Sequence, residues 1–321
     1  MKNLRKFMVL TAIFALLASC KTVEVDPPEA YYVDEFGNDH NDGVSEKKPF
    51  RTLQRAVDAA LFSGITRIVV SGTLRERVVI NEANGEILIT GRPHRRTVSS
   101  YLSSPGDGRL PEGTAVLTSL NAYRTLAVSG LTRVRLEYIA VIGNIQGGGI
   151  LVADKAELIL GDGARVAGNH ALRGAGIHVA GGGRVTLEGD AAISRNSADI
   201  EGGGVFVHNG TLYLLDGAVI VDNKAASGGG VSLRRSRLTL YGRSSVVDNE
   251  AANAGGGVFA AEESSVAVQF GARVLRNTAR RGGGIFTDTG SSFTNHNGLV
   301  ADNQAAAMED VYHEAGPVQI P

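Results

Sequence analysis

The side chains best suited to chemistry in this sequence are oxygen-bearing groups near residue 40. Asp39, Asn41 and Asp42 lie in a turn between Gly37 and Gly43. A flexible turn that offers several carboxylate and amide oxygens is a ligand set that Ca²⁺ accepts. The turn lacks the twelve-residue spacing with a closing glutamate that a calcium loop between two helices has. Two interpretations therefore stay open, a Ca²⁺ site or a turn held by its own hydrogen bonds.

Catalysis on a polysaccharide would need other groups. Glycoside hydrolysis uses two carboxyl groups at a set separation. Asp222 and Asp248 match in neighbouring repeats, but their column also contains Arg195 and Arg276, and such mixed signs are typical of a surface charge ladder. The seven histidines of the sequence are scattered without metal-ligand spacing. We predict no catalytic residues and, apart from the possible Ca²⁺, no cofactor or metal. A polysaccharide lyase or hydrolase is the alternative.

Cys20, the only cysteine of the chain, follows a short secretion signal. Three basic residues fall within the first six, and an apolar run of eleven residues, 7–17, comes next. This run is too short to span a bilayer and is typical of a cleavable signal peptide. A single cysteine cannot form an intrachain disulfide, so no such structural role competes for it.

The tetrapeptide Leu17-Ala18-Ser19-Cys20 resembles a bacterial lipobox, in which the cysteine is lipidated and becomes the mature N-terminus. The resemblance implies a lipoprotein signal peptide over 1–19 and a lipidated, flexible tether over 20–31. Two or more acyl chains anchor a protein stably to a membrane. Lys21 replaces the aspartate that often retains lipoproteins at the inner membrane, which favours the outer membrane, on its periplasmic or its exposed face. The alternative is an ordinary signal peptide that a cysteine happens to follow.

A repeat of about 27 residues organises the chain from residue 144 onward. Six glycine-rich triplets each precede an isoleucine or valine, and their last glycines lie 27, 28, 26, 27 and 27 residues apart. An asparagine column keeps the same period, and its members are Asn144, Asn169, Asn196, Asn223, Asn249, Asn277 and Asn303. Self-similarity at such a period indicates a stacked-repeat architecture.

Each repeat contains short strands and no helix. Apolar and other residues alternate after each triplet, as in Val205-Phe206-Val207, and again a few residues later, as in Leu212-Tyr213-Leu214. Period-two alternation predicts strands. Three strands per repeat describe one coil of a parallel β-helix, with glycine at one tight corner and asparagine at another. Asparagine tolerates left-handed conformations, and its amide donates and accepts, so stacked asparagines could form a buried ladder.

These features resemble two groups of proteins. The architecture looks like the right-handed parallel β-helix of the pectate-lyase-like superfamily. The triplet and aliphatic-x-x-Asn spacing is similar to the repeats of chlamydial polymorphic outer membrane proteins. The resemblance implies an all-β, right-handed solenoid of about nine coils over 65–321, and an adhesin-like surface role.

The segment 32–64 is predicted to cap the solenoid. Pro49-Phe50-Arg51-Thr52-Leu53 leads into a helical pattern with one apolar face, formed by Leu53, Ala56, Val57, Ala60 and Leu61. The segment resembles the N-terminal entry of secreted β-helix proteins, where a helix closes the open end, and any solenoid needs such a cap. Farther on, the loop 92–113 interrupts the repeats, and a loop of this length is either a functional insertion or an irregular excursion.

One outward column of the repeats is aromatic. The residue between the two inward positions after each triplet is, in order, Leu151, His178, Phe206, Ser232, Phe259 and Phe286. Tyr312 extends this column without a triplet, because Val311 lies eight residues after Asn303, as Ile285 lies eight after Asn277. We call His178, Phe206, Phe259, Phe286 and Tyr312 the aromatic stripe. Outward faces are usually polar, so the aromatic stripe is a candidate contact surface. The alternative is that another segment covers it.

The sequence therefore predicts a non-catalytic, lipid-anchored bacterial envelope protein that presents a β-helix surface for adhesion or protein contact. Its partners are the membrane, through the N-terminal lipid, and a protein or glycan on the β-helix. The formal charge of −1 gives no case for nucleic acid. A polysaccharide-binding or polysaccharide-degrading β-helix protein is the alternative.

Overall fold

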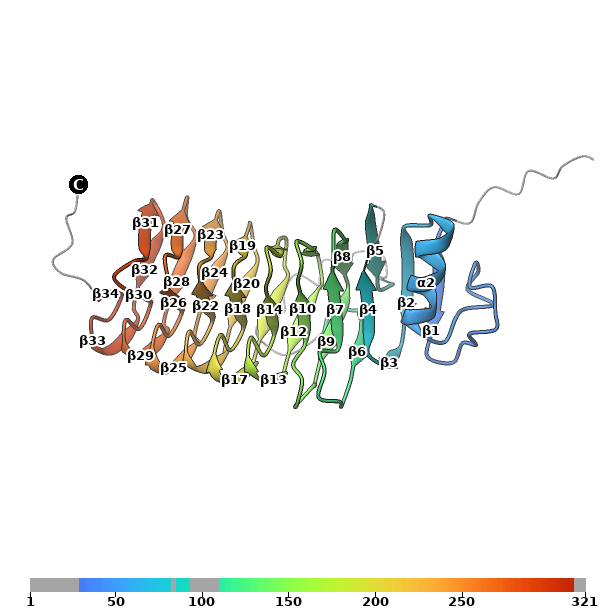
Figure 1. Ribbon diagram of the computed structural model, residues 1–321, viewed down its shortest axis with the longest axis horizontal. Coiled ribbons are helices and arrows are strands. Elements are labelled where there is room, and N and C mark those ends of the chain that lie inside the picture. Colours follow the sequence, from blue (N-terminus) through green and yellow to red (C-terminus); the bar gives the residue numbers. More distant parts are fainter. Residues whose placement is uncertain (1–28, 82–84, 93–109, 315–321) are drawn as a thin grey trace, which may run out of the picture.

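The computed structural model describes residues 29–81, 85–92 and 110–314. The predicted signal peptide, Cys20 and most of the tether lie outside these residues, as does most of the loop 92–113. Within them the chain winds into a row of parallel coils that form an elongated solenoid (Figure 1). The predicted all-β parallel β-helix is confirmed. The solenoid has about seven turns, slightly fewer than the nine coils expected.

Three long parallel sheets form the wall of the solenoid. Sheet A consists of β1 (Tyr31–Asp34), β2 (Arg67–Ser71), β5 (Glu86–Thr90), β8 (Arg133–Glu137), β11 (Glu157–Leu160), β15 (Arg184–Leu187), β19 (Thr211–Leu214), β23 (Arg237–Tyr241), β27 (Ser265–Gln269) and β31 (Ser292–His296). Sheet B consists of β3 (Thr73–Arg75), β6 (Ala115–Thr118), β9 (Ile139–Ile142), β12 (Arg165–Ala167), β16 (Ala192–Ser194), β20 (Val219–Val221), β24 (Ser245–Val247), β28 (Arg273–Leu275) and β32 (Leu299–Ala301). Sheet C consists of β4 (Val78–Asn81), β7 (Leu126–Ser129), β10 (Ile150–Val152), β14 (Ile177–Val179), β18 (Val205–His208), β22 (Val231–Arg234), β26 (Val258–Ala261), β30 (Ile285–Thr287) and β34 (Val311–His313).

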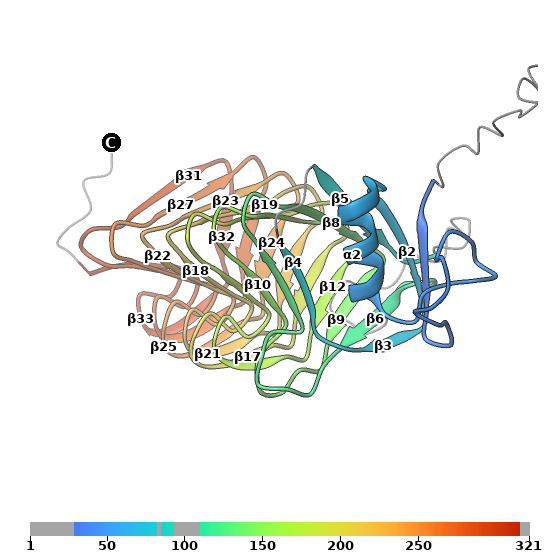
Figure 2. The same ribbon diagram turned by 45° about the vertical axis from the view of Figure 1, so that its right-hand side comes forward.

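A fourth sheet, which the sequence pattern did not predict, follows the asparagines from Asn169 to Asn303, and its first five strands each lead into a glycine triplet. Sheet D consists of β13 (His170–Arg173), β17 (Ser197–Glu201), β21 (Lys224–Ser227), β25 (Glu250–Ala254), β29 (Thr278–Arg281) and β33 (Gln304–Ala307). Figure 2 shows its strands as a separate row beside the main stack. Regular coils therefore contain four strands instead of the predicted three.

The core runs along the inside of sheets A, B and C. Inward side chains are aliphatic, and residues such as Val205, Leu212 and Ile220 are 0% exposed. Because side chains alternate across a strand, every second residue of these sheets enters the core. The coils pair in register, so identical aliphatic positions stack on one another, as Val205 does on Ile177 and Val231.

Helix α2 (Leu53–Ser63) packs on β1, β2 and β4 at the N-terminal end of the solenoid, as predicted for a cap (Figure 1). Thr52 is its N-cap and Gly64, at φ 78°, its left-handed C-cap. Leu53, Ala56, Val57 and Ala60 are buried. Leu61, which the apolar pattern placed on the same face, is instead 36% exposed because the contact covers only one side of a short helix.

Candidate functional site

The asparagine column forms a buried ladder. Asn196 Nδ2 donates to Asn223 Oδ1 at 2.9 Å, and Asn223 Nδ2 to Asn249 Oδ1 at 3.0 Å. The same amide-to-amide bond links Asn169 to Asn196, Asn249 to Asn277 and Asn277 to Asn303. Asn144 joins through its backbone N–H, and Asp310, which the sequence analysis missed, accepts from the last amide at 2.9 Å. These side chains are structural, since they satisfy polar groups inside the wall.

The residue before each ladder asparagine, and not the asparagine itself, takes the left-handed conformation. Arg195, Asp222, Asp248, Arg276 and Asp302 have φ between 53° and 57°. We expected the asparagine to adopt the left-handed conformation at this corner, and this is wrong. The left-handed residue is the one immediately before it. The asparagine backbone keeps a negative φ, and its amide turns inward to bond with the neighbouring coils.

The acidic turn near residue 40 is engaged in hydrogen bonds with its own segment. Asp39 Oδ1 accepts from the backbone N–H groups of Arg51 and Thr52 at 2.8 and 2.9 Å. Asp42 accepts from Val44 N, and Asn41 donates to a backbone carbonyl. No group of three or more His, Cys, Asp or Glu able to hold a metal occurs among the described residues. Of the two interpretations, the geometry favours a turn network.

The aromatic stripe is not a bare surface. Phe206 and Phe286 are 5% and 2% exposed, and His178, Phe259 and Tyr312 are partly buried. The hypothesis of an exposed contact stripe therefore needs correction. Its rings pack on one another, with Phe259, Phe286 and Tyr312 stacked at centroid distances of 5.1 and 5.2 Å.

Side chains of sheet D cover the stripe. Arg173 of β13 lies over Phe206, and Arg281 of β29 lies over Phe286 at 5.2 Å from the ring centroid. The register of sheet D places Glu201, Ser227 and Ala254 between these two arginines in the same column. The stripe and this column therefore face each other across a groove between sheets C and D.

The middle of this groove opens into a pocket of about 560 Å³. Its lining comes from strands of both sheets, namely Glu201, Ser227, Arg234, Asn253, Ala254, Phe259, Arg280 and Arg281. Three arginines and one glutamate give the lining a positive balance. A concave site with one aromatic ring and a few convergent polar groups has the general form of a small-molecule site.

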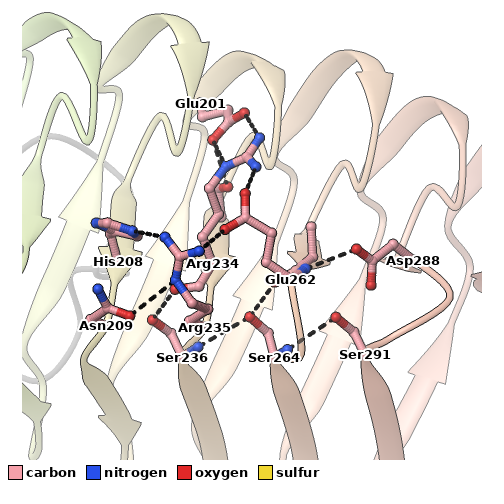
Figure 3. A network of polar contacts seen from close by, with 12 residues as sticks. Glu201, His208, Asn209, Arg234, Arg235, Ser236, Glu262, Ser264, Asp288 and Ser291 are labelled. Carbon is pink, nitrogen blue, oxygen red and sulfur yellow. Dashed lines mark hydrogen bonds and ion pairs between the residues drawn. The ribbon is translucent and has the colours of Figure 1, made fainter.

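The only carboxylate in the pocket lining is neutralised. Arg234 binds Glu201 with two nitrogens, Nε to Oε2 at 2.9 Å and Nη2 to Oε1, and bonds Glu262 through Nη1 (Figure 3). The hydrogen bond to Glu201 is the main reason why the pKa of Arg234 is raised. The side chain of Glu201 is only 8% exposed. A carboxylate held in this way, without a second carboxylate in the lining, does not meet the requirement of glycoside hydrolysis.

A serine ladder beside this network was also missed. Gly210 N donates to Ser236 Oγ. Ser236 N donates to Ser264 Oγ at 3.1 Å, and Ser264 N to Ser291 Oγ at 3.0 Å (Figure 3). The three serines are 28 and 27 residues apart, so the repeat period could have revealed them. They join neighbouring coils between sheets C and A, as the asparagines do between sheets B and D.

His178 lies at a crowded, positively charged end of the groove. Burial, and then the charges of Arg124, His208 and Arg173, lower its pKa to about 4. Burial also lowers the pKa of Arg124 to about 10. Arg124 donates to the carbonyls of Gly174 and Arg173, which ties it to the start of sheet D. His178 is therefore neutral at pH 7, and its role is packing against Phe206.

Acidification should weaken the fold through His178. Its pKa is lower in the folded state than in the unfolded chain, so the unfolded chain binds the proton first and stability falls as pH drops from about 6.5 to about 4. The loss reaches about 2–3 kcal/mol. Urea unfolding at pH 7.5 and 4.5 measures it, and His178→Leu, which copies Leu151 of the preceding coil, should remove most of this difference. An equal pH dependence in both proteins would show that other groups carry it.

Comparisons with protein families, curated proteins and solved structures find no match for this chain. The fold alone therefore shows the class of this protein. It is an all-β parallel β-solenoid, and it has a groove between sheets C and D. No helix in the described part of the chain has the length and apolar character needed to cross a membrane.

Proposed function

We propose that this chain is a lipid-anchored bacterial envelope protein whose solenoid binds a partner and catalyses no reaction. The observation that carries the proposal is the pocket between sheets C and D. It offers guanidinium groups and one ring, while its single carboxylate, Glu201, is bound by Arg234. Such a lining can hold an anionic or polar ligand but supplies no free acid–base pair.

The N-terminal lipid anchor is inferred from the sequence. A basic start, an apolar run of eleven residues and Cys20 place a lipidation site ahead of the capping segment. The tether 20–31 would then hold the solenoid near the membrane by its N-terminal end, with the groove extending away from it. This arrangement suits adhesion or protein contact at the outer membrane.

Polysaccharide binding is the second candidate, and a specific observation favours it. Phe259 stands in the pocket beside the side chains of Asn253, Ser227 and Arg280. A ring next to amide, hydroxyl and guanidinium groups matches the mixed apolar and polar character of a sugar.

Replacing Cys20 by serine should abolish lipid labelling and membrane retention. In a bacterial host fed labelled palmitate, the wild-type chain should carry the label and stay in the membrane fraction after a carbonate wash. Ser19→Ala, which keeps a small residue before the cysteine, is the matched control and should behave as wild type. A Cys20→Ser protein that still carries the label would disprove the anchor.

The binding function is tested separately with the full chain in detergent. It is probed on a glycan array and for turnover of acidic and neutral polysaccharides. Binding without turnover supports the proposal. Release of shortened sugar chains would contradict a non-catalytic role and favour the enzyme alternative.

A further inference from the structure

The geometry points to a membrane-binding face at the corner between sheets B and C, where apolar side chains would enter the bilayer interface and arginines would contact anionic lipid headgroups. The inference goes beyond the proposed lipid anchor, because it concerns a second contact that the solenoid itself makes. We call the apolar members of this face, Leu120, Tyr123, Ile145, Leu172 and Ile200, the corner patch.

The corner patch belongs to four successive coils. Each coil passes from sheet B to sheet C through one connecting segment. Leu120 and Tyr123 lie in the segment after β6, and Ile145 lies in the segment after β9. Leu172 and Ile200 follow on β13 and β17. Neighbouring parallel strands are about 4.8 Å apart, so three steps from coil to coil give the patch a length of about 14 Å.

These side chains are exposed, and the repeat does not require them. Four of the five members are between 62% and 75% exposed, and Ile200 is 37% exposed. Leu172 lies three residues after its ladder asparagine, and the matching positions of three later coils hold Ala226, Ala252 and Arg280. A large apolar side chain is therefore not needed for packing at this position. A contiguous group of such side chains on the surface marks an interaction site.

Basic side chains flank the corner patch. Arg77, in the segment before β4, lies over the ring of Tyr123 at 4.8 Å from the centroid. Arg173 follows Leu172 directly on β13. Both arginines are exposed, as is Arg75 at the end of β3. Apolar side chains beside basic ones are typical of proteins that bind the interface of anionic membranes.

Two carboxylates of the same corner have partners of their own. Glu76 accepts hydrogen bonds from the backbone N–H groups of Leu53 and Gln54, at 2.7 and 3.2 Å, at the start of helix α2. Asp199 Oδ1 lies 3.4 Å from His170 Nε2. The arginines of the corner therefore give it a positive balance, which favours a surface of anionic headgroups.

The shape of the corner favours a bilayer over a protein partner. Figure 1 shows green loops of this corner, at the lower edge of the stack, that extend lower than the strands of sheet D. Side chains on projecting loops can enter a fluid interface one by one. A protein partner would need a surface complementary to each of them.

The position of the corner patch agrees with the predicted anchor. The patch begins on the coil formed by β5, β6 and β7, close to the N-terminal end of the solenoid. The nine residues 20–28 can span at most about 30 Å, so the lipid and the patch can engage one bilayer. Beyond Ile200 the corner becomes polar, with the exposed residues Lys224, Glu250 and Thr278. The C-terminal part of the solenoid therefore stays in water.

Tryptophan fluorescence tests this face, because the chain contains no tryptophan and a single introduced one reports only its own position. Tyr123→Trp places the reporter in the corner patch. Phe270→Trp is the matched control, since Phe270 is 58% exposed at the corner between sheets A and B, on the other side of sheet B. The full chain with either change is reconstituted in vesicles of phosphatidylglycerol and phosphatidylcholine. Their acyl chains are brominated, so that they quench a tryptophan within the bilayer.

The emission of Tyr123→Trp should shift to the blue and be strongly quenched, whereas that of Phe270→Trp should change little. Quenching should fall in vesicles without phosphatidylglycerol and with added NaCl, because the arginine contacts are then lost or screened. Adding Leu172→Asn to the reporter variant should lower the quenching severalfold, since one apolar side chain no longer enters the interface. Leu299→Asn, which changes an exposed leucine of β32, is its matched control and should leave the quenching unchanged.

Equal quenching of the two reporters would overturn the inference. No quenching of Tyr123→Trp in a chain that stays with the vesicles would also overturn it and would leave the Cys20 anchor standing. A blue shift that appears without vesicles and grows with protein concentration would overturn it too, and would assign the corner patch to a second copy of this chain. If the chain carries no lipid, it is mixed with the same vesicles. Quenching of Tyr123→Trp then supports the membrane-binding face although the anchor fails, and its absence contradicts both.

Discussion

Gly229→Ala is expected to destabilise the protein by about 3 kcal/mol or more, because the added methyl group has no room. A Cβ at this position would lie 2.4 Å from the carbonyl oxygen of Glu250 and 2.7 Å from that of Gly256. Both obstacles are backbone atoms of the next coil, so no side-chain rotation can relieve them. The coils would have to move apart, which would stretch the hydrogen bonds between Gly229, Gly255 and their neighbours.

Gly168→Asp is the matched control for this effect. Gly168 has a φ of 63°, and an added Cβ would meet nothing within 4 Å. The same position in later coils is held by Asp222, Asp248 and Asp302, which adopt the same left-handed conformation. The change should therefore cost at most about 1 kcal/mol, because only the left-handed conformation strains the new side chain and aspartate tolerates it. Urea unfolding followed by circular dichroism compares the two, and similar midpoints for both variants would mean that the glycine triplets mark flexibility and not close coil contact.

Most of the fold could be predicted from the repeat period and the residue types in the sequence. Inward aliphatics at a spacing of about 27 residues dictate stacked coils, since a coil cannot bury its apolar face alone. Asparagines in the same register predicted a ladder because a buried amide needs partners on both sides. Helix α2 could be predicted because its residues form one apolar face and lie before the first coil.

Sheet D escaped prediction because its strands bury little. Strand β17 reads Ser-Ala-Asp-Ile-Glu, and only Ala198 and Glu201 are buried. A strand without an alternating apolar face leaves no period-two signal. Its formation depends on coil-to-coil hydrogen bonds, which extend from the regular sheets into the segments between them.

The groove could not be inferred without sheet D. From the sequence, Phe206 and Phe286 occupy outward positions, and this remains correct for sheet C. Their burial comes from the neighbouring rings and from Arg173 and Arg281. The place of the two arginines over the rings is set by a sheet that the sequence did not reveal. The aromatic spacing was a real signal, but it marked the wall of a groove and not an open contact face.

Asn223→Ala is expected to cost about 3 kcal/mol of unfolding free energy, since several buried groups lose their partner at once. The Asn223 side chain is 0% exposed. Its Oδ1 accepts from the backbone N–H and the amide of Asn196, at 3.0 and 2.9 Å. Its Nδ2 lies within 3.0 Å of the carbonyl oxygens of Ile193 and Val221 and of Asn249 Oδ1. Water cannot replace these bonds easily inside the wall.

Asn223→Asp separates the role of the amide donors from that of shape. It keeps one oxygen for Asn196 but turns a second, negatively charged oxygen toward three acceptors in a site without solvent, so it should lower stability more than alanine does at pH 7. Asn253→Ala, at an exposed position of β25, is the control and should change stability by less than about 0.5 kcal/mol. Urea unfolding at pH 7 ranks the three variants. If Asn223→Asp proves as stable as wild type, the ladder amides do not act as donors, and the stacking of coils must be attributed to the aliphatic core and the backbone hydrogen bonds alone.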